Sequence, residues 1–280
     1  MRQICAERYV WAGVPFGCEQ CGGAIFQRAQ SDRAPEEFWE DDPVNERIYS
    51  IPEVRAAFTR KYERYLACLS NGASGKKALL EIGCGSGIFL EAALRHGWSV
   101  YGLDISQQAV ELTRRFCPAA TVRCSSVEKA GFLPGTFDLV ALWDVIEHVE
   151  NPEALLCQAR ALLRPGGSLV LETPDESCPA RHLVRFIHRV TAGRISFLGL
   201  MYFTAHRWYF SRRAMKAALD RAGFPHIRFY REQTVKEFGR RKHASYGMRR
   251  TLSQRLACTF GDAMGTIPWL RNKMVVIATI

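Results

Sequence analysis

The sequence lacks the features that mark membrane and secreted proteins. It contains no uninterrupted apolar run of about 18 residues, which predicts that no helix spans a membrane. The first residues show no basic segment followed by an apolar one, so no secretory leader is expected. The 10 cysteines are scattered, and several lie inside apolar segments, which favours reduced thiols over a disulfide framework. We therefore expect a cytoplasmic protein, and its 48% hydrophobic composition is ample for a packed core.

Carboxylates are scarce in the C-terminal part of the chain. Residues 177–280 contain 20 Lys and Arg but 4 Asp and Glu, whereas residues 1–176 contain 18 and 24. No carboxylate occurs between Ser177 and Leu219. This asymmetry points to an anionic surface or substrate, although a solvated basic face would give the same composition.

A glycine-rich turn between two apolar runs is the most informative local pattern. Residues 78–82 are typical of a buried strand, and glycines follow at positions 83, 85 and 87. Glycine allows a tight turn and a close approach of the backbone to a ligand. A second predicted strand, residues 99–103, is followed by Asp104, whose carboxylate can accept both hydroxyls of a ribose. Together they predict a nucleoside site.

The spacing of the glycines differs from the G-x-G-x-x-G of dinucleotide enzymes. Glu81 stands two residues before the first glycine, and an acidic loop suits a cationic ligand better than a pyrophosphate. This arrangement resembles motif I of the class I S-adenosylmethionine-dependent methyltransferases. Two later blocks, residues 137–149 (FDLVALWDVIEHV) and 162–174 (LLRPGGSLVLETP), are similar to blocks of the same superfamily. The similarity is greatest to the ubiquinone-biosynthesis O-methyltransferases and to related methyltransferases of metabolites and glycans.

The resemblance implies an α/β fold: a Rossmann-like, seven-stranded, mostly parallel sheet with helices on both faces and an antiparallel last strand. We place that last strand at residues 273–279. The implied cofactor is S-adenosylmethionine. Its expected contacts are Glu81, Gly83, Cys84, Gly85, Gly87, Asp104, Ile105, Ser126, Val127 and Trp143. Ser126 stands where many relatives carry an acid near the adenine amino group, and its hydroxyl could still contact adenine.

Three polar residues follow the predicted strand of residues 137–143. Asp144, Glu147 and His148 have the spacing that places side chains on one face of a helical turn. His148 is the natural general base near neutral pH. The resemblance to ubiquinone-type enzymes implies a second role, in which the three bind a divalent cation that acidifies a hydroxyl. A third reading is that Glu147 and His148 cap and orient the loop.

Four regions are expected along the chain. Residues 1–50 form an extension in which Cys18 and Cys21 make half of a zinc ribbon. Residues 51–175 form the cofactor-binding core, which begins with a helix predicted over residues 52–69. Residues 176–210 form a basic amphipathic insertion. It is either a lid packed on the domain or a contact with an anionic membrane, because its position resembles that of the membrane-contacting insertion of ubiquinone-type enzymes. Residues 211–280 complete the fold and begin with a helix that Ser211 is expected to cap and Gly223 to end. His206, just before them, is a candidate acceptor-side residue or a structural histidine.

The sequence thus predicts methyl transfer to an oxygen of a small-molecule, lipid-linked or glycan acceptor. Oxygen is favoured because a base or a cation site is available, and no Asn-Pro-Pro-Tyr-type tetrapeptide follows residues 137–143. Two alternatives stay open. The basic C-terminal part could bind RNA as acceptor, although few aromatics are interleaved with its charges. The chain could also be a non-catalytic protein of this fold that docks on a membrane or a nucleic acid.

Overall fold

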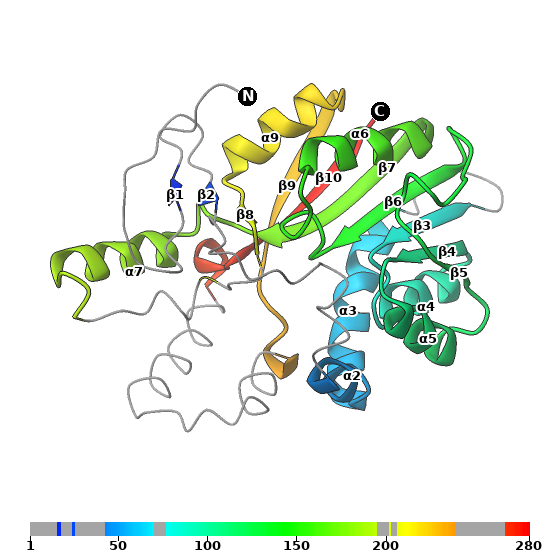
Figure 1. Cartoon of the computed structure of the whole chain (residues 1–280), viewed down its shortest axis with the longest axis horizontal. Helices are drawn as coiled ribbons and strands as arrows, with labels where there is room; N and C mark the ends of the chain where they lie inside the picture. Colours follow the sequence, from blue (N-terminus) through cyan, green and yellow to red (C-terminus); the bar gives the residue numbers. More distant parts are fainter. Residues whose placement is uncertain are drawn as a thin grey trace.

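A seven-stranded sheet forms the centre of the computed structural model (Figure 1). The structure describes residues 43–69, 77–194, 202, 206–238 and 267–280, and the backbone of residues 16–17 and 24–25. The strand order is β5-β4-β3-β6-β7-β10-β9. The strands are β3 (Ala78–Ile82), β4 (Ser99–Asp104), β5 (Thr121–Cys124), β6 (Phe137–Trp143), β7 (Leu163–Pro174), β9 (His226–Glu232) and β10 (Lys273–Thr279). Strands β3 to β7 are parallel, and β10 runs antiparallel to both of its neighbours, which confirms the predicted architecture.

Helices cover both faces of this sheet, and two hydrophobic cores result. Successive strand residues point to opposite faces, so Leu79 and Leu139 belong to one core, whereas Leu80 and Val140 belong to the other. On the first face lie α3 (Pro52–Leu69), α4 (Ile88–Arg95) and α5 (Gln107–Phe116). On the second face lie α6 (Pro152–Leu162) and α9 (Arg212–Arg221). The near-continuous apolar runs of β3 and β6 follow from burial on both sides.

Two helices have the boundaries that the sequence predicts. Helix α3 spans residues 52–69, although its buried side includes Lys61 as well as the expected apolar residues. Helix α9 begins after Ser211, whose Oγ accepts a hydrogen bond from Ala214 N at 3.1 Å. Gly223, with φ of +87°, follows its last turn, where an L residue would be strained.

Smaller elements lie around the sheet. They are α2 (Pro43–Tyr49), α7 (Pro179–Val190), the short helix η1 (Pro268–Leu270), and the strands β1 (Phe16–Gly17), β2 (Ala24–Ile25) and β8 (Trp208–Tyr209). Strand β2 pairs with both β1 and β8, so the N-terminal segment is hydrogen-bonded to the end of the predicted insertion. The predicted zinc ligands Cys18 and Cys21 lie outside the described residues. None of the described helices has the length and apolarity to cross a membrane.

Candidate active site

The site begins where the strand order reverses. Strand β3 lies between β4 and β6, so the loops that follow these strands meet at one edge of the sheet, the usual ligand position in open α/β folds. Gly83, Gly85 and Gly87 have φ values of +74°, +50° and +70°. The amides of Gly83 and Cys84 both donate to Leu103 O, at 2.7 and 3.0 Å, which fixes the loop against β4. The predicted glycines therefore form a left-handed turn at the switch point.

Two buried carboxylates flank this turn. Asp104 accepts hydrogen bonds from the amides of Gly85 and Ser106, both at 3.0 Å. Burial raises the pKa of Asp104, while these amides oppose the rise. Burial, and then the nearby Asp104, raise the pKa of Glu81 well above its ordinary value, and Glu81 Oε2 has no hydrogen-bond partner among the described residues. A ligand that carries an ammonium and a sulfonium fits this pair, because it would supply the missing positive charge.

The other expected cofactor residues have different surroundings. Ile105, beside Asp104, is 41% exposed and offers apolar surface at the mouth of the site. Ser126 and Val127 are half-buried just after β5, where the amide of Ser125 donates to Asp104 O at 2.8 Å. The thiol of Cys84 is buried near Thr113, and burial raises its pKa.

Trp143 at the end of β6 is deeper than the other expected contacts. It is 7% exposed and packs against Tyr62, Tyr65 and Phe89, with ring centroids 4.7, 5.8 and 5.2 Å away. Helix α3 thus covers Trp143 with two of its tyrosines, and little of the indole is accessible to a ligand.

The segment after β6 is a turn and not the helical turn that the spacing predicts. Asp144 has a φ of +56°, and the amide of His148 donates to Val145 O at 3.0 Å. Asp144 forms an ion pair with Lys273 from β10. Burial would raise the pKa of Asp144, but Lys273 and Lys61 outweigh that effect and the pKa is lowered.

Glu147, His148 and His206 form the cluster that the structure does assemble. One potential ligand atom from each of the three lies within 4.8 Å of the others, and the two imidazole rings meet edge to face at 4.7 Å. The amides of Arg207 and Trp208 donate to Glu147 O at 2.8 and 3.1 Å, which brings His206 to the turn. His206, expected on the acceptor side, therefore takes the place that the sequence suggests for Asp144.

The carboxylate of Glu147 is fully buried. Thr173 Oγ1 donates to its Oε2 at 3.0 Å, while Oε1 makes no hydrogen bond within the described part of the chain. Burial, and then the charge of Asp144, raise the pKa of Glu147 well above its ordinary value. Such a group is poised to bind a cation or to stabilise a positive charge on a neighbouring imidazole.

A buried ion network, missed in the sequence, supports this edge of the sheet. Lys61 Nζ lies 2.5 Å from Glu172 Oε2, and Lys273 Nζ lies 2.9 Å from Glu172 Oε1. Since Lys273 also pairs with Asp144, the network links α3, β7, β10 and the turn after β6. A lysine within the apolar stripe of the predicted helix 52–69 was the signal that could have revealed it.

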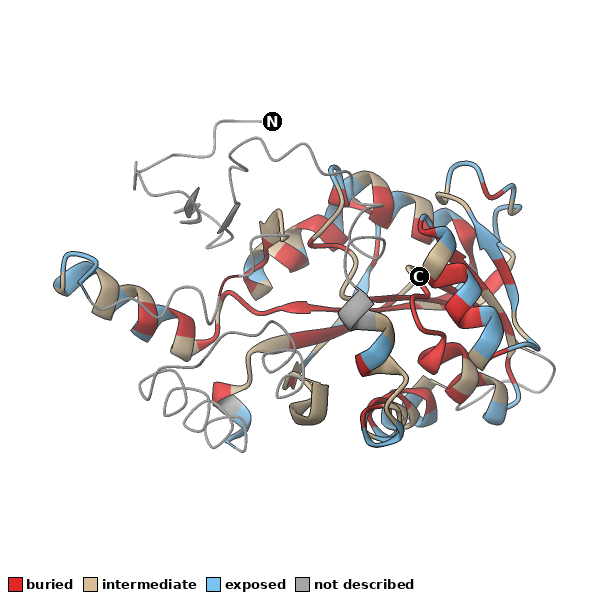
Figure 2. Cartoon of the chain, turned by 60° about the horizontal axis from the view of Figure 1, so that its bottom comes forward, coloured by how far each residue is buried: buried red, intermediate tan, exposed pale blue. Residues whose placement is uncertain are grey.

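Helix α7 lies in the insertion, where the sequence predicts an amphipathic helix, and part of its basic side is buried. Arg181 is 3% exposed and lies over the rings of Tyr202 and Tyr209, while Arg185 pairs with the buried Glu176 at 2.8 Å. Three apolar residues of the helix are exposed, although Val184 is buried. The exposed fractions are 49% for Leu183, 62% for Phe186 and 62% for Val190. Figure 2 shows this helix extending from the body with exposed residues along it.

Comparisons with known proteins show which family the domain belongs to. Residues 53–228 match the family model described as a methyltransferase domain. The mitochondrial ubiquinone biosynthesis O-methyltransferase of Schizosaccharomyces pombe is 33% identical over 152 residues, which cover 52% of this chain and 54% of that protein. The ubiquinone biosynthesis O-methyltransferase of Methylococcus capsulatus is 26% identical over 203 residues, or 68% of this chain and 79% of that protein. The chain thus spans about half the length of the first of these relatives.

Solved structures share the fold. An S-adenosylmethionine-dependent methyltransferase of Archaeoglobus fulgidus superposes with a TM-score of 0.54 at 16% identity, covering 81% of this chain and 94% of that one. Phosphoethanolamine N-methyltransferase 2 of Haemonchus contortus, solved with S-adenosylmethionine, gives a TM-score of 0.53 at 16% identity, covering 79% and 52%. With the family match over more than half of its residues and with this sheet order, the chain belongs to the class I S-adenosylmethionine-dependent methyltransferases.

Proposed function

We propose that this protein methylates an oxygen of a small-molecule acceptor. The observation that carries the proposal is the cluster of Glu147, His148 and His206 beside the glycine turn. Oxygen nucleophiles need to lose a proton during transfer, and the cluster provides a base next to a buried carboxylate. The curated activity of the similar ubiquinone-biosynthesis proteins, O-methylation by name, supports the same class of acceptor.

The residues have distinct roles in this proposal. S-adenosylmethionine, when bound, supplies the methyl group on a sulfonium. Asp104 accepts hydrogen bonds from the ribose, and Glu81 faces the positive charge of the ligand. His148 would take the proton of the acceptor hydroxyl while the oxygen bonds to the methyl carbon, and the sulfonium, when bound, would give up its methyl by cleavage of the carbon–sulfur bond and leave as a neutral thioether. The resulting imidazolium lies beside Glu147, whose ionised form it stabilises.

A divalent cation is the second candidate for the same cluster. Two imidazoles and one carboxylate are common ligands of divalent transition metals, and such a cation would return buried Glu147 to its ionised form. It would lower the pKa of a bound hydroxyl, which makes His148 a ligand instead of the base. Thermal melts with and without Mn²⁺, on wild type and Glu147→Gln, separate the two: stabilisation by Mn²⁺ that the variant loses supports the cation.

We also propose that α7 contacts an anionic membrane and thereby gives access to a lipid-linked acceptor. Leu183, Phe186 and Val190 are exposed at a spacing that places them along one side of the helix. Arg189 is exposed beside this apolar side, and Arg185, which pairs with Glu176, keeps 36% of its side chain exposed. This composition is typical of helices that lie in a lipid interface.

The function is tested first by calorimetric titration of S-adenosylmethionine into wild type and Asp104→Asn. We expect binding that the variant weakens at least about tenfold, the size of one lost charge-assisted hydrogen bond. Asp138→Asn, at the opposite end of the sheet, is the control and should bind as wild type does. Loss of methyl transfer to hydroxyl acceptors in His148→Gln, with cofactor binding retained, supports the catalytic role. A folded wild type that does not bind the cofactor would refute the proposal.

A further inference from the structure

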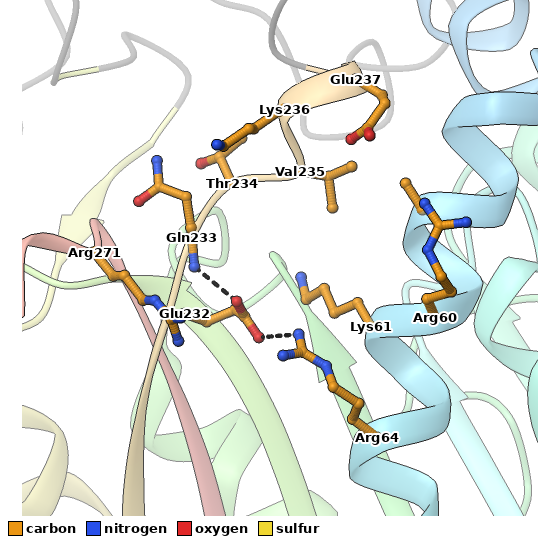
Figure 3. Close-up of a pocket in the computed structure, with 11 residues that line it drawn as sticks. Arg60, Lys61, Arg64, Glu232, Gln233, Thr234, Val235, Lys236, Glu237 and Arg271 are labelled. Carbon is orange, nitrogen blue, oxygen red and sulfur yellow. Dashed lines mark hydrogen bonds and ion pairs between the residues drawn. The ribbon is translucent and has the colours of Figure 1, made fainter. Parts of the chain in front are cut away.

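A cavity of about 310 Å³ lies between α3 and the segment that follows β9 (Figure 3). Its lining includes five basic side chains and two carboxylates. The basic residues are Arg60, Lys61 and Arg64 from α3, Lys236 after β9, and Arg271 before β10. Figure 3 shows the α3 side chains directed across the cavity toward the segment of residues 233–237.

The two carboxylates do not neutralise this charge. Glu232 is already saturated, because its Oε2 accepts from Arg64 at 2.8 Å and from Tyr65 at 2.9 Å, while its Oε1 accepts from the amide of Gln233 at 2.9 Å. Lys61 is engaged by Glu172. Among the residues that the structure describes, Arg60, Lys236 and Arg271 form no ion pair, and Glu237 is the second carboxylate of the lining. A surplus of positive charge therefore remains in the cavity.

The far wall of the cavity is held in place. Asn272 Nδ2 donates to Thr234 Oγ1 at 3.1 Å, and the amide of Thr234 donates back to Asn272 Oδ1 at 3.2 Å. Arg271 Nη1 donates to Arg231 O at 3.1 Å, which orients its guanidinium. A preorganised wall lowers the entropic cost of binding a ligand.

The position of the cavity connects it to the acceptor side of the active site. Glu232 pairs in register with Lys273, and Lys273 contacts Asp144 in the turn that precedes Glu147. Lys61 Nζ also lies 5.5 Å from the ring of Trp143. The cofactor is cationic and its acidic loop follows β3 on the other side of β6, so a basic cavity here does not suit it.

From these observations we propose that the cavity binds an anionic group, a carboxylate or a phosphate, of the methyl acceptor. The proposal rests on the proposed methyltransferase function. Three strand spacings, about 14 Å, separate β9 from β6, so the anionic group lies within roughly that distance of the methylated oxygen. The acceptor is thus an anion of about the length of one or two rings, with or without a longer apolar substituent.

The test is calorimetric titration of the full chain at low salt with benzoate, phenyl phosphate and neutral benzamide. We expect the anions to bind and benzamide not to bind, and the tighter of the two anions identifies the group. Arg60→Gln/Lys236→Gln should weaken anion binding about tenfold or more, because charge-assisted hydrogen bonds are lost. Arg228→Gln, an exposed arginine on β9 away from the cavity, is the matched control and should bind as wild type does.

S-adenosylmethionine is titrated into every variant in parallel. Unchanged cofactor binding together with weakened anion binding supports the proposal. Equal anion affinity in the double variant and wild type, equal binding of benzamide and benzoate, or no anion binding to wild type would each overturn it. Anion binding through the cavity in a wild type that fails to bind the cofactor would instead overturn the proposed function, and the assignment of the cavity to an acceptor with it.

Discussion

Val145 occupies the space that a Cβ on Gly83 would need: its Cγ2 lies 2.5 Å from the ideal Cβ position. This contact joins the loop after β3 to the turn after β6. Gly83→Ala should therefore destabilise the protein by about 2–4 kcal/mol, the sum of a left-handed backbone for alanine and an overpacked contact. Chemical denaturation measures this loss of stability, and cofactor titration shows whether the altered loop still binds the cofactor.

Gly135→Ala is the matched control for this substitution. Gly135 has a φ of +67°, yet a Cβ there would meet nothing within 4 Å, so only the backbone cost of about 1–2 kcal/mol should remain. Gly83→Ala combined with Val145→Ala should regain part of the loss. Equal destabilisation by Gly83→Ala and Gly135→Ala would show that the contact with Val145 carries no energy.

Lys61→Met should destabilise the protein by about 3 kcal/mol, because it leaves Glu172 with one of its two cations deep in the core. Adding Glu172→Gln removes the carboxylate charge that has lost its pairing with Lys61, and it should restore part of the stability. Urea denaturation of both single variants and the double variant completes a double-mutant cycle. Strict additivity of the two substitutions would contradict the coupling of Lys61 to Glu172.

Glu81→Gln should make the ligand-free protein more stable than wild type, and this difference in stability should grow as the pH rises. Burial raises the pKa of Glu81 in the folded state, so above the ordinary glutamate pKa the unfolded chain holds fewer protons and ionisation favours unfolding. The stabilisation by the variant should be absent below about pH 4 and reach at least about 1 kcal/mol at neutral pH, the equivalent of one pKa unit.

The same variant should bind S-adenosylmethionine more weakly, because the charge that destabilises the empty site attracts the ligand. Melting temperatures from pH 4 to pH 8 and cofactor titrations measure both effects. Glu111→Gln on the surface of α5 is the control and should leave both unchanged. A stability difference that does not vary with pH would contradict the assignment.

Phe186→Ser/Val190→Ser should abolish cosedimentation of the protein with vesicles of phosphatidylglycerol, if α7 lies in the lipid interface. Each side chain would bury apolar surface worth roughly 1.5–3 kcal/mol. Leu133→Ser, at a 76% exposed residue outside α7, is the control and should cosediment as wild type does. Binding of wild type to phosphatidylcholine as strong as to phosphatidylglycerol would argue against a role for Arg185 and Arg189.

The strands, α3, α9 and the glycine turn could be predicted because their signals are local. Periodic apolar residues, Ser211 as N-cap and Gly223 after the last turn each act within a few positions of the chain. Glycine at 83 was equally readable, since a left-handed turn requires it.

The arrangement of charges could not be predicted because it depends on residues far apart in the sequence. Lys273 reaches Asp144 from β10 and pairs with it, and the backbone of Glu147 accepts hydrogen bonds from the segment that carries His206. Which side of α7 is buried could not be predicted for a similar reason. Tyr202 and Tyr209 provide a site for Arg181 that no helical pattern reveals.

The position of β10 between β7 and β9 has a consequence for how the chain folds. In the described sheet, β9 pairs with β10 alone. Because β10 follows some 40 positions later in the chain, β9 has no partner strand until β10 has been synthesised and has joined the sheet. Docking of β10 also delivers Lys273 to Glu172 and Asp144. We therefore expect the last step of sheet assembly to form the cofactor-binding site as well. In refolding experiments, the slowest phase seen by backbone signals should then equal the slowest phase seen by cofactor binding.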